Sequence, residues 1–109
     1  MSGVVTAPCS AVGRAAMRLS QEVDRLGAYA DFCEGDRVAL LSFEVGLSVW
    51  CEYGPDGGMR FRWWTGEVDA NDRYVYTWCP ASMAPTAARS VFGRWAELKL
   101  RGEAGRSDG

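Results

Sequence analysis

Apolar residues recur at intervals of three and four over residues 12–26, and this spacing predicts an amphipathic helix near the start of the chain. Ser10 stands at the position of an N-cap, and Gly27 stands where a left-handed residue commonly ends a helix. The positions that define the apolar stripe are Val12, Ala15, Ala16, Leu19, Val23 and Leu26.

The pattern changes after the helix from a period near 3.6 to a period of two. Residues 28–36 predict a connection in which Tyr29 and Phe32 cover the core. Residues 37–43 are β-rich, and residues 47–53 alternate apolar and polar side chains. We therefore expect two strands with Gly46 at the turn or bulge between them, although one long strand bent at Gly46 fits the same pattern.

Two turn signals delimit two more strands. The run Gly54-Pro55-Asp56-Gly57-Gly58 predicts a hairpin, after which residues 59–66 alternate Phe61 and Trp63 with arginines. Residues 69–72 turn the chain again. Residues 73–79 then form a fourth strand, with Tyr74, Tyr76 and Trp78 on one face, and Pro80 ends it.

A second amphipathic helix follows a start signal at residues 82–85 and continues to Gly102. We expect Glu97 and Arg101 to form an i,i+4 pair on its polar side. The chain thus divides into a loose N-terminal arm (residues 1–9), one domain (10–101) and a polar C-terminal tail (102–109). The predicted fold class is α+β: a two-layer domain with a four-stranded antiparallel meander and both helices packed on one face.

The amino-acid composition excludes several kinds of catalytic and binding site. The chain has no histidine, which excludes Ser-His-Asp, Cys-His and histidine–metal sites. It has a formal net charge of −2 and a pI near 5.1, so no basic footprint for nucleic acid or an acidic membrane covers the molecule. No nucleotide-binding, hydrolase or metal motif is present, and we predict no cofactor and no metal. Carboxylates near strand ends leave an enzymatic role open, but the pattern favours a non-enzymatic one.

Four cysteines occur without any C-x-x-C spacing, so a zinc site is not predicted. We expect all four thiols to be reduced, with Cys51 and Cys79 inside strands and Cys9 the most reactive because it lies in the loose arm. Cys33 falls in the ambiguous connection. The first ten residues lack the features of a secretory signal, and no apolar run is long enough to span a membrane; the expected location is the cytoplasm.

The sheet suggests a binding face. If Phe61 and Trp63 contact the helices, alternation directs Arg60, Arg62 and Trp64 to the other side, where Trp50 joins them. Arginine and aromatic residues are enriched at interface hot spots, so we predict a protein partner or a homodimer at this face. The alternative is ordinary solvated arginines beside tryptophans that pack across strands. Stacking of single-stranded nucleic acid is disfavoured by the acidic pI.

A second hypothesis treats the protein as a small-molecule binder of a biosynthetic pathway. Its pocket would lie between helices and sheet and would be lined by Trp63, Trp78 and Trp95. Sequence alone does not separate an aromatic concavity from a flat aromatic patch.

Three segments carry a resemblance to a protein group: Leu26-Gly27, the run RFRWWTGE and the run AARSVFGRWAEL. Over residues 10–101 the chain resembles short actinobacterial proteins with a helix, meander, helix pattern. The resemblance implies an accessory or regulatory role for a small intracellular protein. It carries over no catalytic residue.

Overall fold

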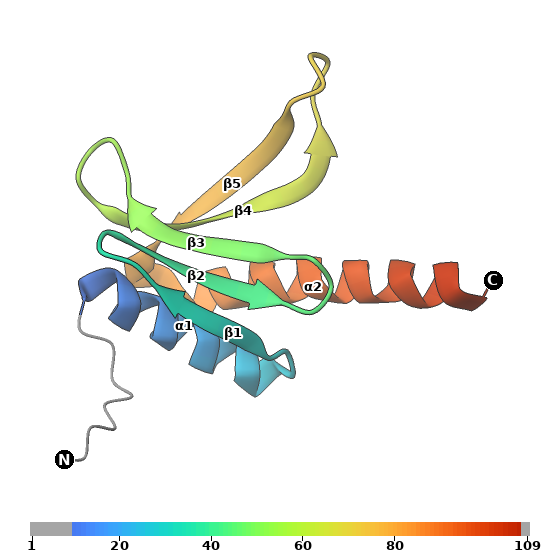
Figure 1. Ribbon diagram of the computed structural model, residues 1–109, viewed down its shortest axis with the longest axis horizontal. Coiled ribbons are helices and arrows are strands. Elements are labelled where there is room, and N and C mark those ends of the chain that lie inside the picture. The colour runs from blue at the N-terminus through green and yellow to red at the C-terminus, as the bar shows by residue number, and fades with distance from the viewer. Residues whose placement is uncertain (1–9, 108–109) are drawn as a thin grey trace.

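Two helices and a five-stranded antiparallel sheet make up this computed structural model, which describes residues 10–107 (Figure 1). The predicted arm, residues 1–9, lies outside the described residues. The elements in chain order are α1 (Ala11–Leu26), β1 (Ala30–Glu34), β2 (Val38–Phe43), β3 (Ser48–Tyr53), β4 (Met59–Val68), β5 (Tyr74–Pro80), the 3₁₀ turn η1 (Ala81–Met83) and α2 (Ala84–Ser107).

Helix α1 has the predicted ends. The Ser10 hydroxyl accepts a hydrogen bond from the Gly13 backbone N–H at 3.0 Å, which satisfies one of the free donors of the first turn. Gly27 has a φ of +113°, and its N–H donates to the carbonyls of Val23 and Asp24. The capping residues therefore fix both ends of the helix, as the sequence predicts.

The sheet is a meander in the order β1-β2-β3-β4-β5, and every neighbouring pair is antiparallel. The prediction of an α+β fold with an antiparallel sheet is confirmed, but the strand count is five and not four. The missed strand is β1, inside the predicted connection. Within that segment Phe32 does pack against the core, whereas Tyr29 is 73% exposed and covers nothing there.

The turns between strands lie where the glycines of the sequence predict them. Gly46 has a φ of +83° and its N–H donates to the Phe43 carbonyl at 3.2 Å, so β2 and β3 are two strands and not one bent strand. Gly54 closes the predicted hairpin by donating to the Gly58 carbonyl at 2.7 Å. Strand β4 runs two residues beyond its predicted end, through a register irregularity between Trp64 and Val68.

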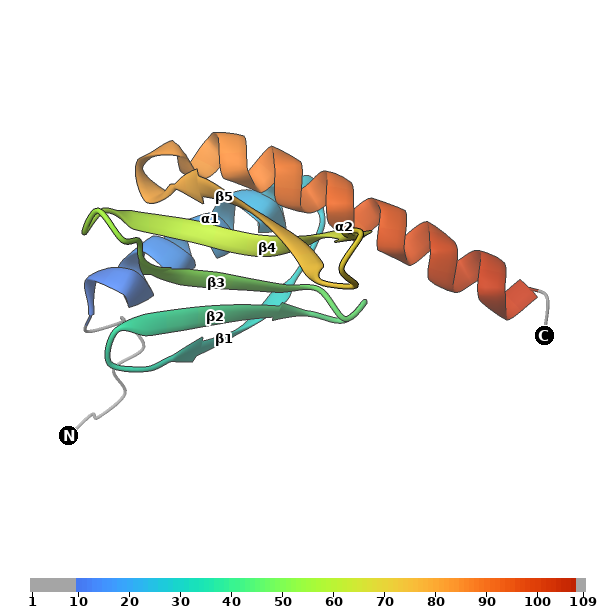
Figure 2. The ribbon, with the colours of Figure 1, turned by 90° about the horizontal axis from the view of Figure 1, so that it is seen from above.

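Both helices pack on the same face of the sheet, as predicted (Figure 2). Helix α1 lies against β1, β2 and β3, while α2 lies beside α1 and reaches β4 and β5. The largest fully buried side chains come from both layers and include Leu19 of α1, Leu41, Val49 and Phe61 of the sheet, and Val91 of α2. Burial of these apolar surfaces drives the packing of the two layers.

Helix α2 continues past its predicted end. It extends to Ser107, so the segment predicted as a polar tail begins inside the helix, and this end projects beyond the sheet (Figure 1). Neither Gly102 nor Gly105 breaks the helix. Among the described residues, no helix combines the length and apolarity that a membrane crossing requires.

Candidate functional site

The side of the sheet away from the helices collects the predicted binding residues. Phe61 and Trp63 of β4 are buried beneath the helices, so the alternate residues Arg60, Arg62 and Trp64 lie on the opposite side. Cross-strand partners share a face, and Trp50 pairs with Arg62 across β3 and β4. All four predicted residues therefore lie on one surface, which we call the outer face.

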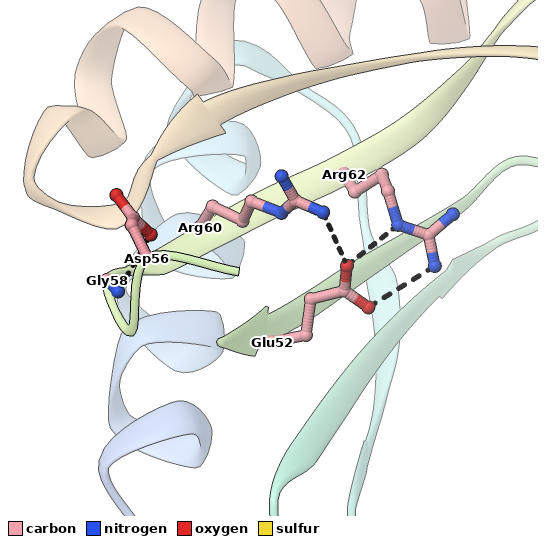
Figure 3. Close-up of polar contacts among 5 residues, drawn as sticks. All are labelled: Glu52, Asp56, Gly58, Arg60 and Arg62. Atoms are coloured by element: carbon pink, nitrogen blue, oxygen red, sulfur yellow. Dashed lines mark hydrogen bonds and ion pairs between the residues drawn. The ribbon is translucent and has the colours of Figure 1, made fainter. Parts of the chain in front are cut away.

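An ion cluster joins β3 and β4 on the outer face, near the hairpin that connects the two strands (Figure 3). Arg62 donates through Nε to Glu52 Oε2 at 2.9 Å and through Nη2 to Oε1 at 3.2 Å. Arg60 adds a longer contact from Nη2 to Oε2 at 3.5 Å. The register explains the cluster, because Glu52 lies directly opposite Arg60 and diagonally opposite Arg62.

Contacts within the cluster shift the pKa values of Glu52 and Arg62. Hydrogen bonding by Arg62 lowers the pKa of Glu52 despite the partial burial of the carboxyl, and the charges of both arginines act in the same direction. The hydrogen bond that Arg62 donates to Glu52 in turn raises the pKa of Arg62. With two arginines and one carboxylate, the cluster has a formal net charge of one positive unit.

Aromatic rings of the edge strand β5 complete the outer face. Arg62 lies over the ring of Tyr76 at 4.9 Å from its centroid, and Arg60 lies over Trp78 at 5.6 Å. The rings of Trp64 and Tyr74 are 5.0 Å apart. Tyr74, Tyr76 and Trp78 are 63%, 45% and 56% exposed, which is unusual for three large rings on one strand.

Sequence reasoning did not assign Tyr74 and Tyr76 to this site. The sequence does contain a signal for these two tyrosines, because alternation places Tyr74, Tyr76 and Trp78 on one face of their strand. The sequence does not show how β5 pairs with β4, and that pairing decides which face of the sheet carries the three rings. The register of Trp64 with Tyr76 and of Arg62 with Trp78 places these rings on the outer face.

In the part of the chain that the structure describes, the three tryptophans predicted to line one pocket are divided between two clefts. Trp95 lines a cleft of about 320 Å³ with Gly27 and Phe43, and its ring stacks on Phe92. Trp63 and Trp78 border a different cleft of about 570 Å³, which lies between α2 and the strands β4 and β5. Trp78 belongs mainly to the outer face, since it pairs with Arg62 in the register and its ring lies under the guanidinium of Arg60.

The second cleft contains a residue that the sequence did not single out. Arg94 of α2 lines it, and only 8% of the Arg94 side chain is exposed. Its Nη1 donates to Glu97 Oε1 at 3.3 Å. Among the described residues, Glu97 therefore forms its ion pair with Arg94 and not with the predicted partner, Arg101.

Cysteines and carboxylates show no further cluster in the described part of the chain. No three histidine, cysteine, aspartate or glutamate side chains there are grouped to hold a metal. Cys33, Cys51 and Cys79 are free thiols. Burial, with a smaller effect of the Glu52 charge, raises the pKa of Cys51 to about 12, so this thiol is a poor nucleophile.

No protein-family model, no curated protein and no solved structure matches this chain. The resemblance to actinobacterial proteins stays a prediction. The outer face and the cleft beside Arg94 are thus the features from which function is argued.

Proposed function

We propose that the protein is a non-enzymatic interaction module whose outer face binds a second copy of the chain. The observation that carries this proposal is the exposure of Tyr74, Tyr76 and Trp78 next to two arginines on the sheet face that the helices leave uncovered. Aromatic residues and arginine are the side chains most enriched at interface hot spots. Burying this surface in a contact removes apolar area from water.

The charges of the outer face favour a second copy over a strongly charged partner. Glu52 already neutralises one of its two arginines, which leaves the ion cluster on each outer face with a single net positive charge. A two-fold contact presents identical surfaces to each other, so a patch must complement itself. A face that carries its own ion pairs and is otherwise aromatic meets that condition with little charge repulsion.

The state of Glu52 supports a non-enzymatic role for this face. A general acid or base works best with a pKa near the operating pH. The arginines move the pKa of Glu52 in the opposite direction, away from neutrality, and occupy both of its oxygens. The cluster therefore orders the surface and is not arranged for proton transfer.

Co-purification of two differently tagged copies tests the proposal. We expect a tagged chain to retain an untagged wild-type chain and to lose it when both carry Tyr76→Ser and Trp78→Ser. Tyr29→Ser is the matched control, because Tyr29 is an exposed tyrosine that is not part of the outer face. Equal retention of the outer-face variant, or no retention of the wild type, contradicts the proposal; in the latter case a different protein becomes the candidate partner.

A further inference from the structure

The cleft between α2 and the strands β4 and β5 is separate from the ion cluster of the outer face. Its volume is about 570 Å³, and it is bordered by the buried indole of Trp63 and by hydroxyls of Thr77, Thr86 and Ser90. One wall is thus apolar and another carries hydrogen-bonding groups. This combination is typical of small-molecule sites.

Arg94 is a buried cation with incomplete partners. A guanidinium has five N–H donors, yet within the described residues Arg94 makes one side-chain hydrogen bond, to Glu97. Its Nε is buried and has no hydrogen-bond partner among the residues that the structure describes. The ring of Trp64, 5.7 Å from the guanidinium carbon, compensates only part of the lost hydration. A buried charge of this kind is stabilised by a further anion.

A glycine next to Arg94 keeps the cleft open. A β-carbon added to Gly93 would meet no atom within 4 Å, so packing does not require glycine there. Glycine inside a helix costs about 1 kcal/mol relative to alanine. Gly93 lines the cleft, and its missing side chain leaves the space in front of the helix free.

We infer that this cleft binds a small organic carboxylate, with Arg94 as the group that pairs with the carboxylate and Trp63 as the wall for the apolar part. Glu97 favours a monoanion over a phosphate dianion. Its carboxylate lies 3.3 Å from Arg94 Nη1 but its side chain is 62% exposed, so it offsets only part of the guanidinium charge and repels the second negative charge of a dianion. This inference does not rest on the proposed dimer, although Trp78 belongs to the outer face and also borders this cleft.

Titration calorimetry with sodium benzoate as the probe tests the inference, with inorganic phosphate in a parallel titration. We expect saturable binding of benzoate to the wild-type chain and weaker binding of phosphate. Gly93→Leu fills the cleft without removing any contact, so it should weaken benzoate binding about tenfold or more. Gly102→Leu is the matched control, because Gly102 is another helical glycine with no atom within 4 Å of an added β-carbon, and it should leave binding unchanged.

Two charge variants separate the role of Arg94 from that of the cleft. Arg94→Gln should abolish benzoate binding, and Glu97→Gln should strengthen it by removing the competing carboxylate. Glu97 is 62% exposed in its side chain, so its substitution does not threaten the fold. The inference is overturned if the wild type binds no benzoate, if Gly93→Leu binds as tightly as the wild type, or if phosphate binds more tightly than benzoate. The mass of each variant in solution, measured alongside, reports the dimer separately.

Discussion

A β-carbon on Gly66 would lie 2.2 Å from Nη2 of Arg94, so the guanidinium can occupy its position only because residue 66 is a glycine. Gly66 also has a φ of +95°, in the region that residues with a side chain avoid. It lies within the register irregularity between Trp64 and Val68. The irregular end of β4 and the buried arginine of α2 therefore depend on the same residue.

Gly66→Ala should destabilise the protein more than Gly57→Ala. Both glycines have positive φ, at +95° and +85°, which costs on the order of 1–3 kcal/mol for alanine. Only Gly66 adds a collision, because a β-carbon on Gly57 meets nothing within 4 Å. Urea denaturation of the two variants measures the difference in free energy of unfolding.

A double variant that combines Gly66→Ala with Arg94→Ala shows why Gly66→Ala lowers the free energy of unfolding more than Gly57→Ala. If the collision with Arg94 causes it, the double variant should be more stable than the sum of the two single losses predicts. Equal losses for Gly66→Ala and Gly57→Ala would show that the guanidinium is not held against this glycine.

The ion cluster makes stability depend on pH in a defined direction. The pKa of Glu52 is lowered from its ordinary value of 4.5, so the folded state holds this proton less tightly than the unfolded chain. The stabilisation is fully present above about pH 4.5 and is lost as the pH falls through the lower, folded value. Glu52→Gln should therefore cost on the order of 1 kcal/mol at pH 7, and this cost should shrink toward acidic pH.

Urea denaturation of Glu52→Gln at pH 7 and at lower pH measures that cost. Glu44→Gln serves as the control, because its carboxylate is 66% exposed and pairs only with Lys99 among the described residues. A loss for Glu52→Gln that is as large in acid as at pH 7 would mean that the arginines do not stabilise the ionised carboxylate.

Thiol reactivity should follow burial. Cys33 is exposed on the edge strand β1, whereas Cys51 is buried and its pKa is raised to about 12. Burial also raises the pKa of Cys79. A thiol reagent applied to the native protein should label Cys33 before Cys79, and Cys51 only in denaturant. Mass spectrometry of the labelled peptides identifies each site, and rapid labelling of native Cys51 would refute the burial of β3.

Local signals account for the parts of the fold that sequence reasoning predicts. Ser10 and Gly27 determine the ends of α1 through hydrogen bonds within a few residues. The turn from Gly54 to Gly58 sets the β3–β4 register in the same way. Strand β1 lacks such signals, because its sequence ADFCE includes alanine and acidic residues that strands disfavour. Its pairing with β2 decides its conformation, and that pairing is a tertiary effect.

The two candidate sites also differ in whether local sequence signals predict them. Alternation along β4 and β3 suffices to place Arg60, Arg62, Trp64 and Trp50 together once one face is assigned to the core. Arg94 has no such signal. It lies between the apolar residues Val91 and Trp95, and a buried arginine at such a position depends on the open backbone at Gly66, 28 residues earlier in the chain. Sequence patterns within one helix do not contain that information.

Sedimentation velocity of the untagged wild-type chain tests the central claim most directly. As the protein concentration rises from about 1 μM to 1 mM, the range of weak to moderate dissociation constants, we expect the mass to shift from one chain of 11.9 kDa to twice that value. The Tyr76→Ser, Trp78→Ser variant should remain at the mass of one chain over the whole range. A wild-type chain that stays monomeric up to the highest concentration would contradict the proposed dimer through the outer face.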